Sequence, residues 1–282
     1  MLCSLLYLLS TATWSASPVW RVEADGRTLF LVGTIHVLRA KDYPLPSALE
    51  QAYAQATRLV FETDIDAGNN PEFTREMLAA VTLPANQQLQ QLLNKDTLAE
   101  LENHLRSRGM TLAQFESFKP AMIAITLTVQ ELQRLGVGDL GVDRFYFEQA
   151  KRDGKMTLAL ETPQQQIGFI ANMGKGLEDL MIRQTLEDIK TLDTQFEDMI
   201  TSWRDGDTST LEALFVTPMR DEFDPIYQQL LVERNRDWMP KLIEYLDTPD
   251  IEMVLVGSAH LLGEEGLLQM LQQRSYRVTQ MD

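Results

Sequence analysis

The sequence is poor in the residues that most often carry covalent or metal chemistry. It has one cysteine, Cys3, and three histidines among 282 residues. A single cysteine excludes an internal disulfide framework and a cysteine-rich metal site. Positive charge is also scarce, with 25 Lys and Arg against 41 Asp and Glu and a net charge of −16. Such a chain would repel phosphate-rich partners, so we expect no nucleic acid as a partner.

Long apolar runs are missing as well. The N-terminal apolar stretch, residues 2–16, carries no charge and is short for a membrane span. Small residues follow it around Ala16, where a peptidase could cleave. We interpret residues 1–17 as a signal peptide, although its start lacks a Lys or Arg. The mature protein would be periplasmic or secreted, with no stable transmembrane span. The alternatives are an uncleaved anchor, a mis-assigned start and an ordinary buried segment.

One pattern occurs near each end of the chain. Residues 29–38 read L-F-L-V-G-T-I-H-V-L, and residues 253–262 read M-V-L-V-G-S-A-H-L-L. Short apolar runs that end in glycine are typical of buried strands, and His36 and His260 follow the two glycines at the same spacing. Two further runs, L-V-F-E-T and L-A-L-E-T, end in Glu62 and Glu161. Because open α/β sheets place their chemistry at strand ends, we expect these four side chains to converge.

The remaining pattern is mostly helical. We predict one α/β (α+β) domain over residues 18–282, with a central mixed β-sheet built from two related halves and with helical layers around it. Large helical insertions would occupy about residues 65–155 and 163–250. Within the second insertion, an apolar stripe over residues 177–203 predicts one long helix. The strand before Glu161 is expected to cover residues 155–161.

The four converging side chains suit two kinds of hydrolytic site. Two histidines with one or two carboxylates can hold a divalent metal ion and leave positions open for water. Without a metal, His36 and Glu62 could activate water directly, and the sequence does not separate these two chemistries. The third histidine, His104, lies in a polar helical stretch, so we expect it at the surface.

Two charged residues outside the repeats have a structural and a functional interpretation. Asp143 opens a predicted helix, where an aspartate is usually the N-cap. Arg234 lies in a charged helical cluster, where it could pair with neighbouring acidic residues. Alternatively, Arg234 could stabilise a developing oxyanion or bind a carboxylate of the substrate.

Taken together, these motifs resemble the TraB/GumN family. The resemblance runs from about Val19 to the end of the chain, and it is carried by F-L-V-G-T-I-H, V-F-E-T, G-V-D, L-A-L-E-T-P, E-R-N-R-D-W-M and V-G-S-A-H-L. That family is related to the Tiki metalloproteases and, more remotely, to erythromycin esterase-like and ChaN-like proteins. The resemblance implies an α/β fold whose two related halves build one site. The Tiki branch implies a divalent metal, with manganese or cobalt supporting peptide cleavage.

The resemblance also assigns roles to residues. His36 and His260 match the two G-x-x-H histidines, Glu62 and Glu161 the two strand-end glutamates, and Arg234 the arginine of the R-N helix. We expect His36, His260 and one or both of Glu62 and Glu161 to hold a divalent ion, which would be manganese, cobalt or zinc. Glu62, His36 and Arg234 would act in catalysis. We therefore expect a metal-dependent, peptidase-like hydrolase acting on a peptide or a small ester or amide. The alternatives are a protein that binds a peptide or haem in the same pocket without turnover, and a metal-free esterase-like hydrolase.

Overall fold

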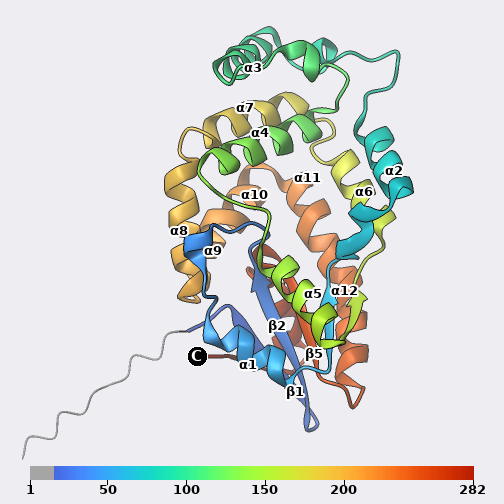
Figure 1. Ribbon diagram of the computed structural model, residues 1–282, viewed down its shortest axis with the longest axis vertical. Helices are drawn as coiled ribbons and strands as arrows, with labels where there is room; N and C mark the ends of the chain where they lie inside the picture. The colour runs from blue at the N-terminus through green and yellow to red at the C-terminus, as the bar shows by residue number, and fades with distance from the viewer. Residues whose placement is uncertain (1–15) are drawn as a thin grey trace, which may run out of the picture.

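The computed structural model describes residues 16–282 (Figure 1). The predicted signal peptide therefore lies almost entirely outside the described residues. The strands are β1 (Val19–Ala24), β2 (Arg27–Thr34), β3 (Arg58–Phe61), β4 (Met156–Ala159), β5 (Glu252–Gly257) and β6 (Arg277–Gln280). They form one sheet in the order β4-β3-β5-β2-β1-β6.

The four strands that carry the repeated motifs are neighbours in this sheet. Strands β2, β5, β3 and β4 pair in parallel, whereas β1 pairs antiparallel with β2 and with β6. Strands β1 and β2 form the expected hairpin, with Asp25 and Gly26 both at positive φ in the turn. Because parallel strands end at the same edge of a sheet, all four motifs finish side by side. The predicted α/β fold with a central mixed sheet is confirmed.

Helices account for most of the remaining chain. They are α1 (Ser47–Gln55), α2 (Pro71–Val81), α3 (Lys95–Ser107), α4 (Pro120–Arg134), α5 (Val142–Asp153), α6 (Pro163–Asn172), α7 (Glu178–Asp188), α8 (Leu192–Arg204), α9 (Thr208–Leu211), α10 (Thr217–Glu222), α11 (Asp224–Tyr227), α12 (Glu233–Leu246) and α13 (Leu267–Gln273). Two π-helical turns, Glu212–Val216 and Gln228–Val232, lie between helices of the second insertion. None of the helices within residues 16–282 combines the length and the apolar character that crossing a membrane requires.

The buried apolar side chains form two clusters. The larger cluster fills the space between the sheet and the helices packed on it, and includes Leu31, Val60 and Leu255. The second cluster lies among α3, α4 and α7, which we call the helical cap. Figure 1 shows the cap on the side of the molecule toward which β2 points. The ends of the parallel strands therefore face the helical cap.

The prediction of a single helix over residues 177–203 is wrong. The chain leaves helical geometry between α7 and α8, where the backbone N–H groups of Lys190 and Thr191 bond only three residues back. The apolar stripe changes its partner at this break. Ile189 is buried in the cluster of the helical cap, whereas Phe196 and Trp203 are buried in the cluster beneath the sheet. Because the helix breaks between α7 and α8, α7 can pack in the cluster of the helical cap and α8 in the larger cluster.

Candidate functional site

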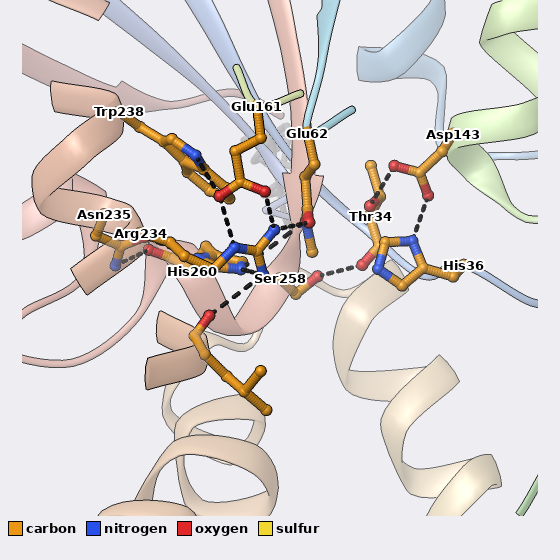
Figure 2. Close-up of polar contacts among 12 residues, drawn as sticks. Thr34, His36, Glu62, Asp143, Glu161, Arg234, Asn235, Trp238, Ser258 and His260 are labelled. Carbon is orange, nitrogen blue, oxygen red and sulfur yellow. Dashed lines mark hydrogen bonds and ion pairs between the residues drawn. The ribbon is translucent and has the colours of Figure 1, made fainter. Parts of the chain in front are cut away.

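The structure places the side chains of the repeated motifs at the end of the parallel strands (Figure 2). Glu62 follows β3 directly, and Glu161 lies two residues beyond the end of β4, which is shorter than predicted. The backbone N–H of Glu161 donates to the carbonyl oxygen of Glu62 at 2.8 Å, so the two residues are neighbours across the strands. His36 lies just beyond β2, and His260 lies in a 3₁₀ turn, Ser258–Leu261, just beyond β5.

His36 and Asp143 form the first of two hydrogen-bonded groups. The His36 Nδ1 atom lies 2.8 Å from Asp143 Oδ2, and Thr34 Oγ1 donates to Asp143 Oδ1 at 2.9 Å. Asp143 is 10% exposed at its side chain, whereas the His36 side chain is 64% exposed. This partnership places the proton of Nδ1 toward the carboxylate and leaves Nε2 pointing away from it. The Asp143 carboxylate also raises the pKa of His36 to about 9.

Sequence reasoning missed the role of Asp143. The N-cap of α5 is Gly141, and the carboxylate of Asp143 turns to His36 instead of capping the helix. The start of α5 is fixed against the end of β2, because Val142 N–H donates to the carbonyl oxygen of Ile35 at 3.0 Å. The signal that could have found this residue is the G-V-D motif, which the family resemblance already contains.

Arg234 forms the centre of the second group (Figure 2). Its Nε and Nη2 atoms donate to the two oxygens of Glu161 at 2.7 and 3.0 Å, and Nη2 also donates to Glu62 Oε2 at 2.6 Å. Its Nη1 atom lies 3.2 Å from the carbonyl oxygen of Leu230 and 3.1 Å from His260 Nε2. A guanidinium has five N–H donors, and these five contacts engage all of them.

His260 is buried and held as the neutral imidazole. Its Nδ1 lies 2.7 Å from the side-chain oxygen of Asn235, whose amide nitrogen donates to the carbonyl oxygens of His260 and Glu265. Since that amide nitrogen is the donor, the Asn235 oxygen must accept, and the proton of His260 sits on Nδ1. Nε2 then offers a lone pair to Arg234. Burial lowers the pKa of His260 to about 3.

His36 Nε2 and Glu62 Oε1 both lie close to the space above the Cα atom of Gly257. A Cβ atom added at Gly257 would lie 3.3 Å from Glu62 Oε1 and 3.4 Å from His36 Nε2. Glu62 Oε1 is fixed there because it accepts from the N–H of Gly257 at 2.7 Å. The absence of a side chain at position 257 thus keeps open a space bounded by an imidazole nitrogen and a carboxylate oxygen.

Opposing effects set the charge of Glu62. Burial on its own would raise its pKa, but the positive charges of His260 when protonated, Arg234 and His36, with the N–H of Gly257, lower it to about 2. Because His260 is neutral above about pH 3, Arg234 and His36 supply the positive charge at neutral pH. Glu62 is therefore an ionised carboxylate, and His36 is its exposed cationic neighbour.

These two histidines predict a stability maximum near neutral pH. Between pH 6.5 and about 3 the unfolded chain binds a proton that folded His260 does not, so the free energy of unfolding falls on acidification. Between pH 6.5 and about 9 the folded chain retains a proton on His36, so stability falls as the pH rises. The acid limb should show the larger total change in stability, because the His260 side chain is 5% exposed and the His36 side chain is largely screened by water.

Urea unfolding at about pH 4, 6.5 and 9 measures both limbs. We expect His260→Gln to flatten the acid limb and His36→Asn to flatten the basic limb, each relative to the wild-type chain. If His260→Gln lost as much stability on acidification as the wild type does, the assignment of a neutral, buried imidazole would be contradicted.

An apolar pocket opens beside His36. Its volume is about 330 Å³, and it lies between the strand ends and the helices α4 and α8. Thr34, His36, Ser258 and Ala259, which lie at or just beyond the strand ends, line one part of it. The apolar walls are Ile35, Val37, Leu132, Leu192, Phe196, Met199 and Phe215. The pocket could hold an apolar group directly beside His36.

His104 lies apart from these groups. It is half-buried on α3, in the helical cap, where burial lowers its pKa. The expectation of a surface position therefore holds only in part.

Comparison with known proteins identifies the family. The sequence profile of the TraB/PrgY/gumN family matches residues 18–280. The chain belongs to this family. It is 26% identical over 261 residues to the uncharacterized protein YbaP of Escherichia coli strain K12, and the match covers 92% of each chain. YbaP of Shigella flexneri matches to the same extent.

A more distant relative of the chain has a named activity. The chain is 24% identical over 303 residues to Metalloprotease TIKI2 of Danio rerio, with 88% of this chain and 57% of that protein covered. No solved structure matches this TraB/PrgY/gumN chain significantly. The family resemblance inferred from the motifs is confirmed.

The side chains of this TraB/PrgY/gumN chain do not fit a divalent ion in the present arrangement. Both oxygens of Glu161 accept from Arg234, and they also accept from Trp238 Nε1 and Gln166 Nε2 at 2.8 Å each. The lone pair of His260 Nε2 is likewise taken by Arg234. Within residues 16–282, no three side chains of His, Cys, Asp or Glu are grouped as a metal site would need.

Proposed function

We propose that this TraB/PrgY/gumN protein is a hydrolase that cleaves amide bonds in peptides. The observation that carries the proposal is the shared space above Gly257, which His36 Nε2 and Glu62 Oε1 both border, while His36 also lines an apolar pocket. An imidazole and a carboxylate on either side of one small space can hold a water and a carbonyl group together. The similarity to a metalloprotease supports the choice of a peptide as substrate.

His36 and Glu62 divide the proton transfers between them. Water adds to the carbonyl carbon, and Glu62 accepts a proton from this water as the new C–O bond forms. His36, which carries its extra proton on Nε2, donates it to the leaving nitrogen as the C–N bond breaks. Glu62 then returns a proton to His36 through solvent. Because Arg234 and His36 lower the pKa of Glu62, this carboxylate is a weak base, and we expect the acid step at His36 to provide much of the rate enhancement.

Asp143 and Arg234 act through these two groups. Asp143 keeps His36 in the required orientation and favours its protonated form. Arg234 holds the second oxygen of Glu62, so that Oε1 stays aimed at the shared space. No step in this mechanism passes through a metal ion, because Glu161 and His260 are fully engaged with Arg234 and its neighbours.

The substrate is expected to carry an apolar side chain next to the cleaved bond. That side chain would enter the pocket beside His36, where it would contact Phe196, Met199 and Phe215. We also propose that the chain acts in the periplasm or outside the cell after removal of residues 1–17, as the apolar N-terminal stretch suggests.

The proposal is tested by incubating the chain, beginning at Pro18, with a library of unstructured peptides and identifying new termini by mass spectrometry. The matched variant is Gly257→Ala. Its added methyl group would occupy the shared space, while the φ of −51° at this position suits alanine. We expect cleavage next to apolar residues by the wild-type chain, and a rate at least about tenfold lower in Gly257→Ala with little change in melting temperature.

The control is Gly68→Ala, where an added Cβ meets no atom within 4 Å. This variant should cleave at the wild-type rate. Peptide binding without any cleavage, with or without added manganese, cobalt or zinc, would instead favour a binding protein. Equal cleavage by Gly257→Ala and the wild type would show that the reaction takes place elsewhere.

A further inference from the structure

Arg234 lies among the side chains predicted as ligands of a metal ion. It contacts Glu62, Glu161 and His260, which are three of the four side chains predicted as metal ligands. The fourth, His36, makes its hydrogen bond to Asp143 instead. A single positive charge thus lies among two carboxylates and an imidazole lone pair, which are the groups that a divalent cation would bind.

The surroundings of Arg234 stabilise it in this position. The residue is 8% exposed, and its guanidinium carbon lies 4.7 Å from the ring centre of Trp238 and 5.1 Å from that of Phe169. Aromatic rings on a guanidinium favour the cation in a site that excludes water. The carbonyl of Leu230, in the π-helical turn before α12, accepts from Nη1 as well. Carboxylates, aromatic rings and a backbone carbonyl therefore all hold the guanidinium of Arg234 in place.

Displacing this arginine would cost much free energy, because its buried partners would lose its positive charge. Glu161 is 3% exposed at its side chain and Glu62 13%, so Glu161 would be a buried carboxylate without a cation, and Glu62 would keep only His36 as a cationic neighbour. A divalent ion placed among them would have to replace five hydrogen bonds while the arginine remained nearby as a repelling charge. The two cations cannot share these ligands.

We infer that Arg234 is an internal counter-cation that excludes divalent metal from Glu62, Glu161 and His260, so that metal binding and the Arg234 ion pairs compete directly. This inference goes beyond the proposed hydrolysis and does not depend on it, because it concerns binding alone. The opposite arrangement would be a preformed metal centre. There, an arginine at this position would orient the ligands and strengthen metal binding.

Isothermal titration of the chelator-stripped chain with manganese and with zinc tests the inference. The variants are Arg234→Met, which removes the charge but keeps an apolar stem, and the control Arg236→Met, which changes an exposed arginine on the same helix. We expect weak binding by the wild type and Arg236→Met, and one ion bound at least about tenfold more tightly by Arg234→Met. Manganese should raise the melting temperature of Arg234→Met alone.

Equal or tighter binding by the wild type than by Arg234→Met would overturn the inference, because Arg234 would then support the metal. Arg234→Lys provides a second test if the methionine variant fails to fold. Lysine keeps one charge but lacks the planar guanidinium that binds both carboxylates. We therefore expect Arg234→Lys to bind the metal more tightly than the wild type and less tightly than Arg234→Met. Identical affinities for wild type and Arg234→Lys would also overturn the inference.

Discussion

His36→Asn is expected to lower the rate of peptide cleavage by about 10³-fold while leaving the fold intact. The amide nitrogen of asparagine can take the place of Nδ1 and donate to Asp143, so the buried carboxylate keeps both of its partners. What the substitution removes is Nε2, the atom that faces Glu62 and the reacting bond. Because the side chain at position 36 is 64% exposed, little buried packing is lost.

The measurement compares kcat/KM and the melting temperature of His36→Asn, His36→Ala and His104→Asn. Alanine removes the donor to Asp143 as well, so His36→Ala should lose both activity and stability. His104 lies in the helical cap, and its replacement should leave the rate unchanged. If His36→Asn kept more than about a tenth of the wild-type rate, proton donation by His36 would not be the main catalytic effect.

Gly141→Ala is expected to destabilise the protein by about 3 kcal/mol or more. A Cβ at this position would overlap the carbonyl group of His36, and it would lie 2.5 Å from the carbonyl oxygen of Ile35. These atoms belong to the backbone just after β2, so they cannot turn aside as a side chain would. Either the end of β2 or the start of α5 must move, and the contact between His36 and Asp143 spans that junction.

Urea unfolding of Gly141→Ala and Gly168→Ala at the same pH measures the difference. Gly168 lies inside α6, and an added Cβ there meets no atom within 4 Å. We expect Gly168→Ala to be neutral or more stable by about 0.5–1 kcal/mol, because alanine favours helix more than glycine does. A Gly141→Ala chain as stable as the wild type would mean that β2 and α5 are not locked together as described.

Much of the framework of the site could be predicted from the sequence. The apolar runs before Gly33 and Gly257 are short, continuous and bounded, so they indicate strands buried on both faces. The structure places these runs in β2 and β5, side by side and parallel. The two repeated patterns, one ending in a histidine and one in a glutamate, then placed His36, His260, Glu62 and Glu161 at the same edge of the sheet. Their roles in metal binding or catalysis stay predictions.

Other features depended on contacts that no local pattern determines. The long apolar stripe before Trp203 is continuous in sequence, but its two halves face two different cores, and this divides it into α7 and α8. Similarly, Asp143 looks like an N-cap by position, yet its carboxylate bonds a histidine 107 residues earlier in the chain. Local propensity is too weak to decide either outcome against tertiary packing.

The sequence by itself determined which apolar runs form the parallel strands, because apolar runs and glycines act on the backbone locally. Only the tertiary structure decided what those residues contact. Arg234 lies 73 residues after Glu161 and 172 after Glu62, and the burial that makes it their common cation exists only once α12 packs beside the strand ends. The same packing leaves His260 neutral and His36 charged, since desolvation and neighbouring charges, not residue type, set which of two identical side chains carries a proton.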